Sequence, residues 1–215
     1  MHMNEVRISK YGKFLSRPLR FLYGYPLVAV ISHWIFQSLF YMEATERWFK
    51  LSLDLILMGL AGFLLNLWLP WQPALIFGFL TAHTLNFLFN GHLWGVLKNY
   101  GYVRIAYEDY TRYVSALAWR ANQVAAIERI VIVGSLARQE WTPQSDLDAR
   151  ILCKRGAFNN LRVCLFLVKE RTRALLQRFP LDLYALDHQS ALNLAPGEIF
   201  EVRMNTRHVI DKGNT

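Results

Sequence analysis

Charged side chains are missing from two long stretches of this chain. Residues 21–42 contain no Asp, Glu, Lys or Arg, and in residues 51–97 Asp54 is the only one. About 20 apolar residues suffice to cross the hydrocarbon core of a membrane, and soluble helices of this length are rarely so free of charge. The first stretch also lacks a small-residue cleavage site, because it ends in Tyr41-Met42-Glu43, which argues against a cleaved signal peptide.

Cysteine is scarce as well. The two cysteines, Cys153 and Cys164, form neither a Cys-x-x-Cys pair nor a zinc-ligand spacing. This argues against a disulfide framework, a redox pair and a structural zinc site. Apolar residues surround both positions, so the sequence predicts two ordinary buried thiols in a reducing compartment.

Three apolar segments divide the first half of the chain: residues 21–41, 51–69 and 74–97. Segments 51–69 and 74–97 are joined by the short uncharged run Leu-Pro-Trp-Gln-Pro, which suits a turn at a membrane interface. We expect these two segments to form a transmembrane hairpin. Segment 21–41 contains more polar residues, and we expect it either to lie in the membrane interface or to enter the membrane and return on the same side.

Basic residues precede the first apolar segment and favour the cytoplasmic side of a membrane; they are Arg7, Lys10, Lys13, Arg17 and Arg20. The sequence thus predicts that residues 1–103 are an all-α membrane anchor in the cell membrane. Residues 104–215 would form a cytoplasmic domain. An alternative is that the three apolar segments are helices buried in a soluble homo-oligomer.

Polar residues inside the apolar segments have two readings. His83, Asn86 and Asn90 fall on one face of a helix, which favours packing against a partner helix over contact with lipid headgroups. Asp54 lies within a turn of the expected start of its span, where it would reach water. The net charge of +8 is compatible with nucleic acid, but no nucleic-acid-binding motif accompanies it, so nucleic acid is not an expected partner.

The second half alternates between helical and strand-like patterns. We expect helices over 105–127 and 157–179, and strands over 129–133, around 146–152, over 180–186 and over 199–203. This order predicts an α+β fold with a small mixed β-sheet and flanking helices.

Three acidic residues in this half carry the predicted chemistry. Asp146 and Asp148 are two apart, so they share a face if they lie on a strand, and Asp182 lies on another predicted strand. Adjacent carboxylates repel each other unless a cation lies between them. Mg²⁺, or Mn²⁺ in its place, suits such ligands, and two ions could clamp a phosphoryl transfer.

A glycine and a serine end the first strand. Gly134 would let the backbone approach a ligand closely, and the Ser135 hydroxyl adds a donor. Good helix formers follow, so the sequence predicts a helix N-terminus that binds an anion. Arg138, one turn on, is either a phosphate contact or a solvated arginine. A basic group on the second predicted helix could hold phosphates or form a solvated or membrane-facing helix face; it consists of Arg162, Lys169, Arg171, Arg173 and Arg178.

The run VGSLARQEWTPQSDLDARIL resembles the signature of the DNA polymerase beta-type nucleotidyltransferase superfamily, in particular its minimal members. The resemblance covers residues 128–187. It implies that Gly134 and Ser135 hold a triphosphate, that Asp146 and Asp148 bind Mg²⁺, and that Asp182 ligates metal and helps to activate the acceptor hydroxyl. Gln139 stands where minimal members often have glycine. This position is not one of the expected metal ligands.

The expected activity is transfer of a nucleoside monophosphate from a nucleoside triphosphate to an acceptor hydroxyl or phosphate. The membrane half points to an acceptor at the bilayer, such as a lipid-linked or cell-envelope sugar phosphate. Many relatives grip the acceptor with a C-terminal helical domain, which residues 187–215 do not resemble. The acceptor site is therefore expected from the basic helix, the membrane half or a partner chain. The alternatives are nucleotidylation of a protein and a non-catalytic nucleotide-binding scaffold at the membrane.

Overall fold

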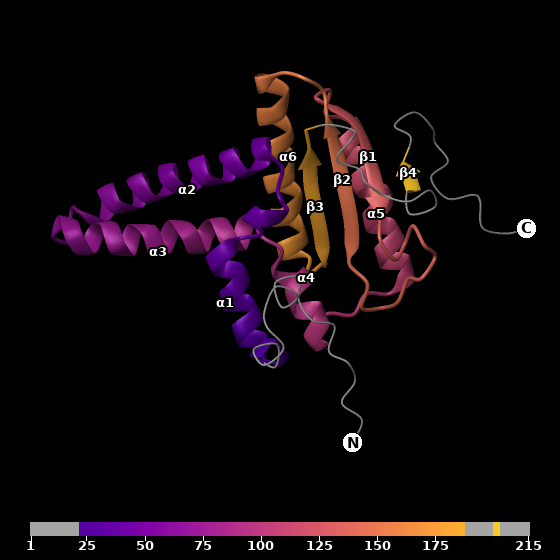
Figure 1. Cartoon of the computed structure of the whole chain (residues 1–215), viewed down its shortest axis with the longest axis horizontal. Helices are drawn as coiled ribbons and strands as arrows, with labels where there is room; N and C mark the ends of the chain where they lie inside the picture. The colour runs from indigo at the N-terminus through magenta and orange to yellow at the C-terminus, as the bar shows by residue number, and fades with distance from the viewer. Residues whose placement is uncertain (1–21, 188–199, 203–215) are drawn as a thin grey trace, which may run out of the picture.

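The computed structural model describes residues 22–187 and 200–202, and it has two connected parts (Figure 1). The N-terminal part contains helices α1 (Pro26–Phe36), α2 (Ala44–Leu65), α3 (Trp71–Phe89) and α4 (Leu93–Leu97), with 3₁₀ turns at Leu39–Tyr41 and Lys98–Tyr100. The second part contains α5 (Tyr107–Asn122), β1 (Ile127–Val133), β2 (Leu147–Cys153), α6 (Ala157–Leu176), β3 (Leu181–Leu186) and β4 (Phe200–Val202). The predicted basic N-terminal residues lie outside the described residues.

The second part has the mixed α+β architecture that the sequence predicts. Its four strands have the order β3-β2-β1-β4, with β2 and β3 parallel and the other pairs antiparallel. The parallel pair is joined through α6, as such a crossover requires. The expected strand over 199–203 is present as β4, and the two expected helices are shorter by a few residues than the patterns suggested.

Helices α5 and α6 cover one face of this sheet. Alternate strand residues such as Ile130, Ala149 and Leu183 join Leu117 of α5 and Leu167 of α6 in the main hydrophobic core. Side chains alternate along a strand, so the residues between them point to the other face. The face that carries the acidic residues is therefore the one that α5 and α6 leave uncovered.

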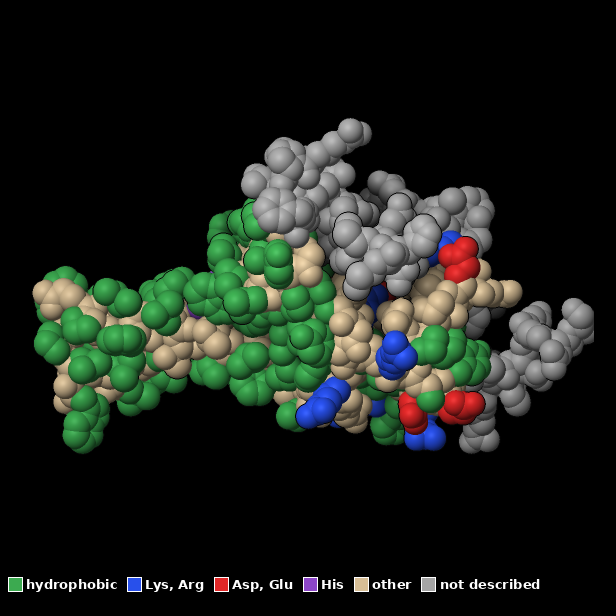
Figure 2. Space-filling model, turned by 90° about the horizontal axis from the view of Figure 1, so that it is seen from below, with side chains coloured by type: hydrophobic (Ala, Val, Ile, Leu, Met, Phe, Trp, Pro, Cys, Tyr) green, Lys and Arg blue, Asp and Glu red, His purple; other side chains and the backbone are tan. Residues whose placement is uncertain are grey.

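Helices α2 and α3 form an antiparallel hairpin that extends away from the sheet as an arm (Figure 1). The two helices approach closely where Gly78 faces Gly62: a Cβ on Gly78 would lie 2.7 Å from the Gly62 backbone nitrogen. Such contact between small residues is typical of tightly packed apolar helices. Figure 2 shows hydrophobic side chains over the surface of this arm.

The helix boundaries correct several expectations for this half. Segment 21–41 yields only the 11-residue helix α1, which ends where Gln37 and Ser38 adopt left-handed φ angles of 46° and 61°. Segment 74–97 is broken after α3. Among the described residues, α2 is long and apolar enough to cross a membrane by itself. Helix α3 meets the same criterion only together with Leu93–Tyr100, from which it is bent by 72°, and helices of this kind are by themselves weak evidence of a membrane protein.

Polar residues join the two helices of the arm. His83 Nδ1 lies 2.7 Å from Asp54 Oδ2, and the Asn86 amide donates to Asp54 Oδ1 at 3.2 Å. Asn90 donates in turn to Asn86 Oδ1. This confirms that the stripe at 83, 86 and 90 packs helix against helix. Because α2 begins at Ala44, Asp54 lies farther inside the helix than expected, and its partly exposed carboxylate is bound by these neighbours.

A buried polar junction connects the base of the arm to the sheet. The Arg171 guanidinium donates to Glu46 Oε1 and to the Leu183 carbonyl at 2.5 Å each, and to Asn90 Oδ1 at 2.7 Å. The second Glu46 oxygen accepts from the Ala185 backbone N–H at 2.9 Å. These bonds satisfy the Leu183 carbonyl and the Ala185 N–H, two backbone groups on the edge strand β3. The two halves on either side of the proposed boundary near residue 103 thus differ in composition, but their side chains are in close contact.

Candidate active site

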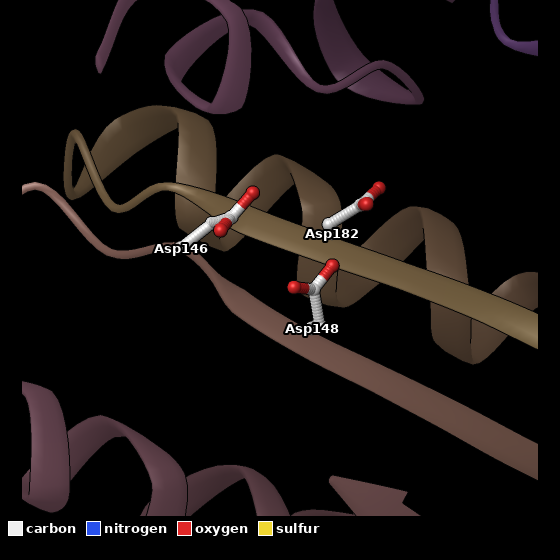
Figure 3. A group of neighbouring side chains, drawn as sticks. All are labelled: Asp146, Asp148 and Asp182. Carbon is white, nitrogen blue, oxygen red and sulfur yellow. The ribbon is translucent and has the colours of Figure 1, made fainter. Parts of the chain in front are cut away.

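The three predicted acidic residues converge on the face of the sheet opposite α5 and α6. The parallel register of β2 and β3 places Asp148 directly opposite Asp182, and Asp146 immediately precedes β2. One ligand atom from each residue lies within 4.8 Å of the others. Figure 3 shows the three carboxylates in one group beside the two strands. Oxygen ligands on opposite sides of a Mg²⁺ ion are about 4 Å apart, so the donor type and the spacing both fit a divalent cation.

Gly134 contacts this cluster directly. It follows β1 with φ +78°, and a Cβ there would lie 2.5 Å from Asp148 Oδ2. Only glycine combines this left-handed backbone with such a close approach. The residue that sequence reasoning placed at a strand end therefore lies against one of the three carboxylates.

The region after Gly134 corrects one expectation. Residues 134–139 form successive turns instead of a helix, with Arg138 N bonded to Gly134 O at 3.1 Å and Glu140 N to Ser135 O at 2.8 Å. Gln139 is left-handed at φ 60°, which a helix cannot accommodate. No helix N-terminus is therefore present at this turn to bind an anion. The Arg138 guanidinium forms an exposed ion pair with Glu140 at 2.8 Å.

Comparison with known families gives one match, which overlaps this site. The family model described as the nucleotidyltransferase domain covers residues 114–192, from within α5 to beyond β3. Residues 114–192 are therefore similar to a nucleotidyltransferase domain, and this name is used for them below. Comparisons with curated proteins and with solved structures give no match. The family supports a transferase that uses a nucleoside triphosphate, and all of the candidate residues named above lie within the matched range.

The segment before β2 is held by the core of the nucleotidyltransferase domain. The Tyr110 hydroxyl of α5 donates to the backbone oxygen of Asp146 at 2.9 Å. Burial raises the pKa of Tyr110 well above its usual range, which keeps this hydroxyl protonated. Ser145 closes the turn that precedes Asp146 by accepting from the Thr142 backbone N–H at 3.0 Å. Asp146 is thereby fixed at the start of β2.

Two residues from before the nucleotidyltransferase domain reach its acidic cluster, and sequence reasoning assigned them no such role. Lys98 forms a buried ion pair with Asp146. His92 lies 3.5 Å from Asp182 through Nδ1, donates to the Leu181 carbonyl at 3.0 Å, and packs on Tyr184. Burial holds the pKa of His92 well below its ordinary value. About 50 to 90 residues separate these partners along the chain, so no local spacing could have revealed them.

The basic helix of the nucleotidyltransferase domain differs from its expected role. Arg171 is buried in the junction with Glu46, so it is neither solvated nor open to a phosphate. Arg173 pairs with Glu170, Arg162 lies over the Phe158 ring and Arg178 over the Trp94 ring. Most of this basic group therefore serves packing and ion pairing.

Proposed function

We propose that this protein is a membrane-anchored, metal-dependent nucleotidyltransferase. It transfers a nucleoside monophosphate from a nucleoside triphosphate to an acceptor hydroxyl or phosphate and releases pyrophosphate. One observation carries the proposal: Asp146, Asp148 and Asp182 converge beside Gly134 within the stretch that matches the nucleotidyltransferase family. A domain that only bound nucleotide would have no need of the third carboxylate.

The proposed roles follow from the position of each side chain. Asp146, Asp148 and Asp182 would hold Mg²⁺, or Mn²⁺, which neutralises charge on the transferred phosphoryl group. Gly134 leaves room for a phosphate beside Asp148, while Ser135 and Arg138 supply a hydroxyl and a guanidinium for the triphosphate. Asp182 is the most buried of the three, at 4% exposure, which suits a base that accepts the proton of the acceptor hydroxyl.

Exposed aromatic residues at both ends of the arm support membrane anchoring. Trp48 near the base of α2 and Trp68 at the tip are 68% and 86% exposed. From Trp48 to the end of α2 at Leu65 the helix rises about 26 Å, and Trp68 lies in the turn just beyond, so the two tryptophans are separated by about the thickness of the hydrocarbon core. Tryptophan prefers the two membrane–water interfaces. Exposed apolar residues such as Leu60 and Phe63 lie between the two tryptophans.

The position of α1 supports an acceptor at the bilayer. This helix runs across the direction of the arm (Figure 1), so it would lie along the surface of a membrane that the arm enters. Ala29 of α1 packs with Val96, two residues before Lys98, which contacts Asp146. The cluster is therefore only a few side chains from the proposed membrane surface. We propose that the acceptor is amphiphilic, such as a lipid-linked or cell-envelope sugar phosphate.

The product of the reaction tests this proposal. Membranes that contain the full chain would be incubated with Mg²⁺ and each nucleoside triphosphate labelled at the α-phosphate, and then separated into lipid and protein fractions. Label in the lipid fraction, absent with Asp148→Asn and retained with the exposed Asp109→Asn, is the expected result. Label in protein alone would instead indicate protein nucleotidylation. Absence of label together with absence of pyrophosphate would indicate a non-catalytic scaffold.

A further inference from the structure

Lys98 brings a positive charge from the N-terminal half into the acidic cluster. It begins the 3₁₀ turn after α4, and its Nζ forms an ion pair with Asp146 Oδ1. The Lys98 side chain is 8% exposed and that of Asp146 is 21% exposed. Removing one partner from an ion pair that is shielded from water is strongly unfavourable. The pair is therefore expected to persist when other ligands bind.

The backbone around Lys98 is anchored on α1. Val96 is buried against Tyr23 and Ala29, and the Tyr100 hydroxyl donates to the Tyr23 backbone oxygen at 2.6 Å. These contacts lie two residues on either side of Lys98, so they fix the start of its side chain. The ammonium is thus a built part of the cluster and not the end of a flexible surface side chain.

The charges of Asp146, Asp148, Asp182 and Lys98 limit how many divalent cations the cluster binds. The formal charges of the three aspartates and Lys98 sum to minus two, which one divalent ion balances. Two divalent ions would instead leave the group with two positive charges in partly buried surroundings, where charge interactions are strong. A second ion is therefore expected only when the phosphates of a nucleotide supply further negative charge.

We infer that Lys98 serves as a fixed cation of this site, so that the nucleotide-free protein binds a single divalent ion. Asp148 and Asp182 hold that ion, while Asp146 stays paired with Lys98. The inference rests on the proposed function, in which these carboxylates bind metal, and it changes the expectation of two resident ions. It also makes the N-terminal half part of the active site, because Lys98 lies outside the matched range of 114–192.

Counting bound Mn²⁺ tests this inference. The full chain in detergent, without nucleotide, would be titrated with Mn²⁺ and the free ion measured by electron paramagnetic resonance. We expect one ion per chain. Lys98→Met keeps an unbranched side chain of similar length but removes the charge, so it is expected to bind two ions. Lys98→Arg, which keeps the charge, and Lys154→Met, which alters an exposed lysine beyond the far end of β2, are expected to bind one.

The outcomes separate this inference from the proposed function. Two ions in the unchanged protein, or one ion in a folded Lys98→Met variant, would overturn the role of Lys98 and leave the proposed function standing. Binding of no Mn²⁺ at all would overturn both. If Lys98→Met does not fold, the decision passes to Asp146→Asn, which is expected to keep its single ion while Asp182→Asn loses it. Loss of the ion in Asp146→Asn would then contradict the inference.

Discussion

Breaking the buried pair between Glu46 and Arg171 should unfold the junction between the arm and the sheet. Both side chains are almost completely buried, at 2% and 1% exposure, and their closest atoms are 2.5 Å apart. Removal of one partner from a buried ion pair costs about 3–5 kcal/mol, because the other charge is left without compensation. Glu46→Ala also leaves the Ala185 N–H without its acceptor, which adds about 1 kcal/mol.

A double-mutant cycle measures this coupling. Glu46→Ala, Arg171→Met and the double variant would be unfolded chemically in detergent, and their free energies of unfolding compared. Arg171→Met is expected to cost about 3–5 kcal/mol, and Glu46→Ala about 1 kcal/mol more because of the Ala185 N–H. The double variant should cost about 3 kcal/mol less than the sum of the two, because it leaves no unpaired charge. The exposed pair Asp109–Arg112 is the control, and loss of this pair should cost less than about 1 kcal/mol. Additive single effects would refute the view that this pair joins the two halves.

Three further perturbations have defined outcomes. Gly134→Ala should lower both pyrophosphate release and Mn²⁺ affinity at least about tenfold. The added Cβ would displace Asp148 Oδ2, and an alanine at φ +78° is strained by about 1–2 kcal/mol. Unchanged kinetics would contradict the close approach of Gly134 to Asp148. Burial raises the pKa of Cys153 and Cys164 to about 12, so both thiols should resist a thiol reagent at pH 8 until the protein unfolds. Because unfolded thiols ionise at lower pH than the folded ones, stability should fall as the pH rises above about 9, whereas rapid labelling of the native protein would contradict this burial. Leu60→Glu on the exposed face of α2 should abolish cosedimentation with lipid vesicles while unfolding stays cooperative. If the unchanged protein is instead a soluble oligomer that does not bind vesicles, the alternative of helices buried between copies is favoured.

The sequence predicted the sheet and the acidic cluster because both depend on local patterns. The β-branched run over 129–133 is typical of a buried strand, and β1 contains it. Asp146 and Asp148 have the spacing of residues that share one face of a strand. Asp182 could be placed beside them because consecutive strands of a small sheet commonly pair. In each case neighbouring residues carried the information.

The missed features depend on contacts between distant parts of the chain. Lys98 reads as a charge that flanks an apolar segment, and Arg171 as one member of a basic helix face. Their roles arise only when the N-terminal half packs against β3 and Asp146, and no helical or strand period encodes that packing. The expected helix after Gly134 failed for a related reason. Residues 134–146 must return the chain from β1 to pair antiparallel with β2, and this requirement overrides the helix propensity of Leu136-Ala137-Arg138.

Pyrophosphate release measures whether the three carboxylates carry out nucleotidyl transfer. The full chain would be given Mg²⁺ and a mixture of nucleoside triphosphates in the presence of its own membranes, and pyrophosphate would be followed over time. We expect release that requires Mg²⁺ and that falls at least about 100-fold in both Asp148→Asn and Asp182→Asn, because each removes a carboxylate from the cluster. The Asp109→Asn protein should match the unchanged chain. Release that persists in folded Asp148→Asn and Asp182→Asn proteins would contradict the assignment of the chemistry to these carboxylates.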